Sequence, residues 1–234
     1  MHAQTDTMNQ LQFLGIPVFW LLVIVAFLLP KIPVAGKFFN IINTMIHEFG
    51  HALAALLLKG EVIKIQIFND TSGVTFTKSS SKFASIIISL CGYTFASVTA
   101  YLCFFLLSVG YEKWIIAGLS ILFLFIMLLW IRQNTYGVIW VLSFTGLNLL
   151  LLFYFKNETA IQVAAWFYSL MILIESVWSA IVIFMLSLRD PHQAGDATNL
   201  HKSTHVHAVI WGILFLAFAV FMGYKSLLII KTLI

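Results

Sequence analysis

Long apolar segments dominate this chain and decide what it can fold into. A helix needs about 20 apolar residues to cross the hydrocarbon core of a bilayer. Segments near that length cover residues 13–29, 38–58, 83–109, 114–131, 137–155, 163–187 and 207–230. Because backbone N–H and C=O groups find no water in hydrocarbon, we expect each segment to be a helix that satisfies them internally.

The composition supports a membrane environment. Of the 234 residues, 61% are hydrophobic and only 9% are charged, whereas a soluble domain is about 25% charged. So few charges cannot cover a water-facing surface. The sequence therefore predicts an all-α membrane protein, a polytopic bundle of about six to seven transmembrane helices. The lower number applies if one segment is re-entrant or interfacial. Residues 1–234 are expected to form one membrane-embedded domain.

The charge pattern excludes one class of partner and favours another. The formal net charge is +4, and the basic residues are scattered over short loops without a run of five or six. Nucleic-acid binding therefore has no electrostatic footprint. A mild positive charge suits a protein that sits between the anionic headgroups of a lipid bilayer. The first apolar segment lacks a basic leader and a small-residue cleavage site, so we expect a retained span that ends at Pro30 and Pro33.

A short β-hairpin is expected after the second helix, over residues 62–78. Ile63, Ile65 and Ile67 alternate with polar residues, a turn-like segment follows at 69–73, and alternation then resumes. Such a hairpin can offer a strand edge to an extended peptide. It can equally act as a lid that seals a cavity in the membrane, and the sequence favours neither role.

The second apolar segment contains the sequence His-Glu-Phe-Gly-His at residues 47–51. On a helix, His47 and His51 lie one above the other on a single face, so both imidazoles can reach one zinc ion. Glu48 lies beside the open coordination position, where it can take a proton from a zinc-activated water. Asn40, Asn43 and Thr44 extend this polar face at helical spacing. Ionisable residues inside a span are costly, so the stripe is expected to face the bundle interior and to be functional.

The third zinc ligand stays open on the residues alone. A catalytic zinc site usually has three protein ligands and one open position. Asp196 follows Gly195 near an expected helix start, where small neighbours let a carboxylate approach the metal closely. Asp190 precedes a proline and has the character of a turn residue. The other candidates are His192, His201, His205, His207 and, inside the sixth span, Glu175.

Two other classes of protein compete with a zinc hydrolase. The histidines at 47, 51, 201, 205 and 207 are reminiscent of a di-iron membrane oxygenase, but seven histidines without an adjacent pair are few for two metal ions. A non-catalytic membrane protein, either an inactive relative or a metal-binding scaffold, is the second alternative. The intact Glu48 argues against it, because a metal carrier needs no base beside its ligands.

Four places in the sequence carry a family resemblance. They are His47-Glu48-Phe49-Gly50-His51 followed by Ala52-Leu53, Asp70-Thr71-Ser72-Gly73 in the hairpin, Gly92-Tyr93, and Gly195-Asp196-Ala197 with Leu200 and Thr204. Through these four segments the chain resembles the site-2 protease superfamily of intramembrane zinc metalloproteases, and it looks closest to the bacterial M50B-like branch of that superfamily. The resemblance implies that His47, His51 and Asp196 bind Zn²⁺ and that Glu48 is the general base.

The resemblance also implies a substrate, a location and a partner. It implies hydrolysis of peptide bonds within or near a transmembrane segment of a membrane protein, in a bacterial inner membrane. A regulatory membrane protein is a further possible partner. The chain departs from better-known members in two places: Cys91-Gly92-Tyr93 stands where they have a Gly-Pro…Asn element, and residues 130–134 carry one residue more than their Trp-Arg-Asn-type segment.

Overall fold

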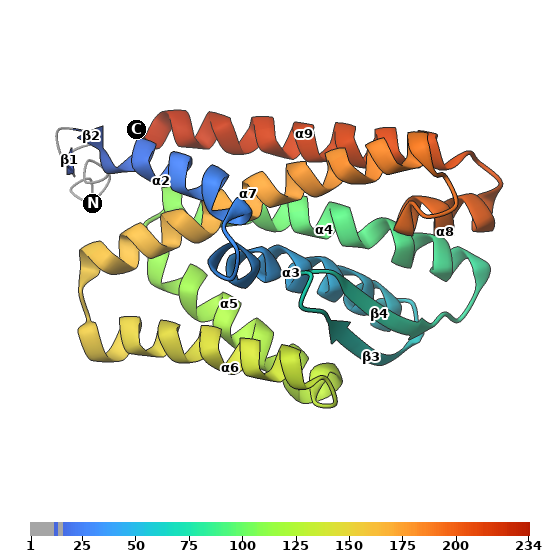
Figure 1. Ribbon diagram of the computed structural model, residues 1–234, viewed down its shortest axis with the longest axis horizontal. Helices are drawn as coiled ribbons and strands as arrows, with labels where there is room; N and C mark the ends of the chain where they lie inside the picture. The colour runs from blue at the N-terminus through green and yellow to red at the C-terminus, as the bar shows by residue number, and fades with distance from the viewer. Residues whose placement is uncertain (1–11, 14–15) are drawn as a thin grey trace.

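A computed structural model describes residues 12–13 and 16–234 of the chain. Most of this part is helical, and the long helices lie side by side along the longest axis of the molecule (Figure 1). The helices are α2 (Val18–Leu28), η1 (Leu29–Lys31), α3 (Ala35–Leu57), α4 (Lys82–Ser108), α5 (Glu112–Ile126), η2 (Met127–Ile131), α6 (Thr135–Leu149), η3 (Leu150–Phe155), α7 (Glu158–Arg189), α8 (Gly195–Thr204) and α9 (Ala208–Leu233). The strands are β1 (Gln12–Phe13), β2 (Ile16–Pro17), β3 (Glu61–Ile67) and β4 (Gly73–Lys78).

Five helical segments in the described residues are long and apolar enough to cross a membrane. They coincide with the last five expected spans, and α5 and α6 each continue into a π-helical end, η2 and η3. The predicted all-α membrane bundle is therefore confirmed. The spans are Lys82–Ser108, Glu112–Ile131, Thr135–Phe155, Glu158–Arg189 and Ala208–Leu233.

The first two expected spans meet at a sharp bend. Val18–Lys31 and Ala35–Leu57 are long and apolar enough to cross a membrane only when taken together, and the angle between them is 97°. Pro30 and Pro33 end the first helix as expected, and Val34 then turns the chain with a φ of 69° and a ψ of −66°. The Ala35 amide donates to the Pro33 carbonyl at 2.9 Å, which closes a three-residue γ-turn. Counted as one broken span, this pair brings the total to six, the lower expected number.

Helix α3 lies in the middle of the bundle. In Figure 1 the helices α4, α7 and α9 lie on one side of it, and α5 and α6 on the other. Glycine makes the α3–α4 contact close: a Cβ at Gly50 would lie 2.6 Å from the Cys91 carbonyl oxygen. Small residues at helix crossings allow this approach of backbones in a membrane bundle. The histidine end of the polar stripe is therefore packed against α4 rather than against lipid.

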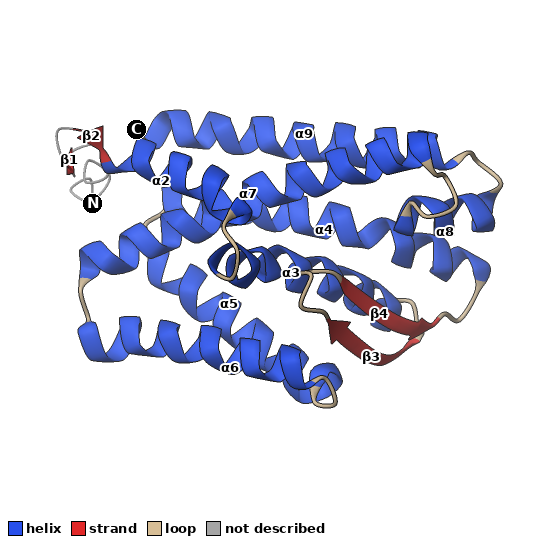
Figure 2. Cartoon of the chain, viewed as in Figure 1, coloured by secondary structure: helices blue, strands red, loops and turns tan. Residues whose placement is uncertain are grey.

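The β-hairpin forms as expected, at one end of the bundle (Figure 2). Ile65 pairs with Thr75 and Ile67 with Gly73, but the register shifts between Val62 and Lys64. Because of this irregularity, Ile63 does not share the buried face of Ile65 and Ile67; its side chain is 59% exposed. In the turn, hydrogen bonds from the Ser72 hydroxyl and amide hold the pKa of Asp70 below its usual range.

A polar network joins three of the spans. The Asn148 side chain of α6 donates to the Ser120 hydroxyl of α5 at 2.9 Å and accepts from the Tyr168 hydroxyl of α7 at 2.8 Å. Asn148 is buried, so each of its partners replaces a water that the membrane cannot supply. The network thus ties α5, α6 and α7 together.

We expect Asn148→Ala to destabilise the bundle, because it leaves the Ser120 and Tyr168 hydroxyls without their buried partner. The loss should be about 1–2 kcal/mol in the free energy of unfolding, measured by SDS titration in mixed micelles. Thr145→Val is the matched control: the Thr145 hydroxyl is equally buried, on the same helix, and has no partner in the described structure. An equal loss in both variants would mean that the network adds nothing.

Candidate metal centre

Two helices that are far apart in the sequence supply the polar groups of the site. Helix α3 carries His47 and His51 one turn apart, and α8 brings Asp196 in its first turn. Gly195, just before it, has a φ of +48°, a conformation that glycine adopts without strain. The apolar side of α8, Ala197 and Leu200, is fully buried against α7 and α9. This packing fixes the position from which Asp196 reaches α3.

The three side chains converge on one point. His47 Nε2 lies 3.0 Å from His51 Nε2, and Asp196 Oδ2 lies 3.3 Å and 3.2 Å from these two nitrogens. A tetrahedral zinc ion holds its nitrogen and oxygen ligands roughly 3.3 Å from one another, given bonds of about 2.0–2.2 Å. The donor set, two imidazoles and one carboxylate, is also one that zinc accepts. These residues therefore fit a metal ion.

Neighbouring groups prepare two of the three side chains, His51 and Asp196, for a cation. The His51 ring donates from Nδ1 to the Ile88 carbonyl oxygen at 2.7 Å, which leaves Nε2 with its lone pair facing the other two groups. Burial favours the neutral acid of Asp196, but the imidazoles of His51 and His47 outweigh it and hold the pKa of this carboxyl below its usual range.

Gly92 of α4 lets a second helix close over the histidines. A Cβ at this position would lie 2.5 Å from His47 Nε2 and 2.6 Å from His51 Cε1. The next residue, Tyr93, packs its ring edge-on against the His47 ring, with 4.5 Å between the centroids. Sequence reasoning found Gly92-Tyr93 as a motif but not the reason for the glycine, which is the space taken by the two imidazoles.

Glu48 lies beside the histidines and is held by the hairpin. Its side chain is only 5% exposed, and Thr75 of β4 donates to Glu48 Oε2 at 2.6 Å. Gly73 packs directly on the same carboxylate: a Cβ there would lie 2.8 Å from Oε1. Sequence reasoning missed both contacts, since nothing in the hairpin pattern links it to residue 48.

A cavity of about 520 Å³ opens onto these groups. Its walls come from α3, β4, α4 and α8, so every element that carries a polar group of the site also lines it. Gly73, Val74, Thr75 and Thr77 form the hairpin part of the wall, and Asp196 belongs to the part that α8 supplies. The cavity therefore reaches both Glu48 and the three converging side chains.

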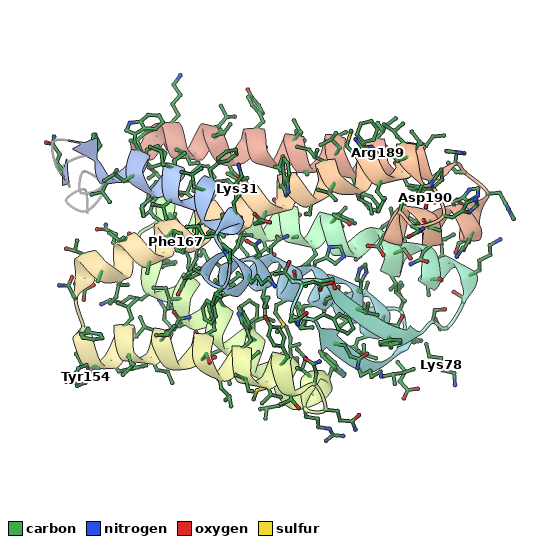
Figure 3. All side chains as sticks on the ribbon, viewed as in Figure 1. Lys31, Lys78, Tyr154, Phe167, Arg189 and Asp190 are labelled. Atoms are coloured by element: carbon green, nitrogen blue, oxygen red, sulfur yellow. The ribbon has the colours of Figure 1, made fainter. Side chains whose placement is uncertain are left out.

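The other candidates for a third ligand lie elsewhere. Asp190 ends α7 (Figure 3) and accepts from the His192 amide and the Gln193 side chain, as expected for a turn residue. His201 bonds the Val206 carbonyl, and Glu175 lines a separate cavity of about 590 Å³. Within the described residues, His47, His51 and Asp196 are the one group of three that could hold a metal; His2 lies outside them. The two-metal oxygenase interpretation therefore has no second cluster there.

Comparison with known proteins places the chain in a family. The profile of the family described as Peptidase M50B-like matches residues 18–225. The chain belongs to this Peptidase M50B-like family. No curated protein and no solved structure matches it. The match spans α3, the hairpin, α4 and α8, so it includes every group of the site, and it confirms the resemblance seen in the sequence motifs.

Membership gives the protein its general class. Peptidase M50B-like proteins are intramembrane metallopeptidases, and the helical spans make this one an integral, multi-pass membrane protein. The bundle explains how such a site exists in a bilayer, because α4, α8 and the hairpin replace lipid around the polar face of α3.

We expect Gly92→Ala to weaken metal binding in this Peptidase M50B-like protein, because the added methyl group displaces α4 or the imidazoles. The affinity for zinc should fall at least about tenfold, as for other changes around metal ligands, in a competition titration with a chromophoric chelator. Gly118→Ala and Gly146→Ala are controls, since a Cβ at either helical position meets nothing within 4 Å. Unchanged affinity in Gly92→Ala would contradict the close packing described above.

Proposed function

We propose that the protein is a zinc-dependent endopeptidase that hydrolyses peptide bonds within or near a transmembrane segment of a membrane-protein substrate. One observation carries the proposal: His47, His51 and Asp196 meet at 3.0–3.3 Å with the Glu48 carboxylate beside them in a membrane bundle. Two imidazoles, a carboxylate and an adjacent glutamate are the groups that a zinc peptidase needs. We assign the first three as ligands and Glu48 as general base.

The three proposed ligands contribute in two ways, as neutral nitrogen donors and as a negative charge. His47 and His51 offer neutral nitrogens from one helical face, and Asp196 adds a negative charge that compensates a divalent cation in a medium of low dielectric constant. When bound, zinc polarises the scissile carbonyl and lowers the pKa of water to around 7. The Ile88 carbonyl holds the His51 ring in the tautomer that binds metal through Nε2.

Glu48 moves the proton. As a carboxylate it removes a proton from the attacking water, and as the resulting acid it returns that proton to the amine of the leaving peptide. Because its side chain is almost fully buried, few bulk waters compete for it. The cavity that opens onto Glu48 is proposed to admit water and an extended peptide.

The substrate is proposed to lie against the hairpin wall of the cavity. A peptide bond in a helix is protected by its own hydrogen bonds, so a transmembrane substrate must be locally extended before it reaches Glu48. Val74 and Thr75 of β4 line the cavity, which supports contact with such an extended segment. The lid role of the hairpin remains compatible with the same position.

The remaining parts of the proposal rest on the family resemblance. We propose that residues 1–234 act as one domain, that the membrane is a bacterial inner membrane, and that a regulatory membrane protein controls access. A non-catalytic metal-binding protein is the alternative, and the two experiments below separate it from the peptidase.

Purified wild-type protein should contain about one zinc ion per chain, as a mononuclear site does. Asp196→Ala should lose most of it, because two imidazoles alone bind zinc weakly, whereas Glu48→Gln should keep it. Metal content is measured by inductively coupled plasma mass spectrometry. Asp190→Ala and Glu175→Ala are matched controls that remove a carboxylate elsewhere. Zinc that survives Asp196→Ala would show that the third ligand is misassigned.

Hydrolysis should depend on Glu48 at unchanged zinc content. In proteoliposomes, single-span reporter proteins with varied transmembrane sequences should include some that wild type cleaves and Glu48→Gln cleaves at least about 1000-fold more slowly. Fragments are identified by mass spectrometry. A zinc-loaded wild type that cleaves no reporter faster than Glu48→Gln would favour the non-catalytic alternative.

A further inference from the structure

We propose that Thr75 of the hairpin is a positioning residue for the general base, and that Gly73 keeps one oxygen of that base accessible. The inference rests on the proposed function and adds the hairpin to the catalytic machinery. It is carried by contacts between β4 and Glu48, which join two elements that the sequence motifs treat as separate.

The strand presents three alternate residues to α3. Gly73, Thr75 and Thr77 share one face of β4, since side chains on a strand alternate, and all three are partly buried while Val74 and Phe76 are exposed. The residue that meets Glu48 at hydrogen-bonding distance is Thr75. Its hydroxyl oxygen lies 2.6 Å from Glu48 Oε2, the length expected when a hydroxyl donates to an ionised carboxylate.

The hydrogen bond from Thr75 makes the two oxygens of the Glu48 carboxylate different from each other. Oε2 is tied to Thr75, whereas Oε1 has no protein hydrogen-bond partner in the part of the chain that the structure describes. Gly73 lies against Oε1. The Cβ atom of any other residue at this position would lie only 2.8 Å from Oε1. The glycine thus leaves room for a water molecule at the oxygen that is free to accept its proton. A base held in one orientation reacts faster than one that rotates.

The hydroxyl also has a second acceptor in reach. Thr75 Oγ1 lies 3.0 Å from the Glu48 backbone carbonyl oxygen. When Glu48 takes a proton and its carboxylate charge disappears, the hydroxyl can turn its hydrogen to this carbonyl and still be satisfied. Thr75 can therefore hold Glu48 in both protonation states of the proposed cycle, without moving the hairpin.

The bond from Thr75 also helps to attach the hairpin to α3, and this attachment must be separated from the positioning of Glu48. The hairpin is also tied to α3 by a bond from the Thr44 hydroxyl to the Thr71 carbonyl at 2.7 Å, and this bond does not touch Glu48. Thr44→Val removes a hairpin–α3 bond of the same kind and keeps the methyl group that packs on Gly73. It is therefore the matched control for Thr75→Val, which removes a bond to the base.

The experiment compares wild type, Thr75→Val, Thr75→Ser, Thr44→Val and Glu48→Gln in detergent. The probes are β-casein and a synthetic apolar peptide of about 25 residues with a central Gly-Pro break; zinc content is measured on the same samples. We expect Thr75→Val to lower kcat about 10- to 100-fold, as loss of a hydrogen bond to a charged group does. KM and zinc content should change less than about threefold. Thr75→Ser should restore kcat to within about threefold of wild type, and Thr44→Val should affect kcat far less than Thr75→Val.

Three results would overturn the positioning role: wild-type kcat in Thr75→Val, no rescue by Thr75→Ser, or an equal loss of kcat in Thr44→Val. Each leaves the proposed function intact, because wild type still cleaves the probes in a Glu48-dependent way. If zinc-loaded wild type cleaves neither probe faster than Glu48→Gln, the proposed function fails and the inference fails with it.

Discussion

The cost of charged and polar groups inside a membrane helix governs the arrangement of this protein. His47, Glu48 and His51 on α3 could not face lipid without a large penalty. The fold surrounds them instead with other protein groups: the Ile88 carbonyl for one imidazole, Asp196 for both, and the Thr75 hydroxyl for the carboxylate. Gly50 and Gly92 make this possible, because they let α4 approach α3 more closely than any larger residue would.

Three short or irregular elements complete the surroundings of the candidate metal centre. The hairpin contacts Glu48, and α8 supplies a carboxylate although it is too short and too polar to cross a membrane. The bend at Val34 starts α3 in a direction nearly perpendicular to α2. The apolar helix α3 carries His47, Glu48 and His51, and segments that hydropathy alone would treat as connections supply Asp196 and the Thr75 contact.

Much of the fold could be predicted because its signals are local. Apolar length gave the five later spans, strand alternation gave the hairpin, and i, i+4 spacing placed both histidines on one face. The rest depends on tertiary contacts. Apolar length does not report direction, so the bent pair was counted as two spans. Alternation did not reveal the irregularity that exposes Ile63. Spacing could not select Asp196 from the other candidates, and no pattern linked Thr75 or Gly73 to Glu48, because these pairs meet only in the folded chain.

The long sequence separation between α3 and Asp196 has a consequence for biosynthesis. A ribosome delivers α3, the hairpin and α4 to the membrane well before α8 is made, and proteins fold progressively from the N-terminus during synthesis. Until the last helices are in place, the nascent chain has the two imidazoles and the glutamate but not the carboxylate that faces them. A growing polypeptide therefore lacks the third group of the candidate metal centre until α8 has been made.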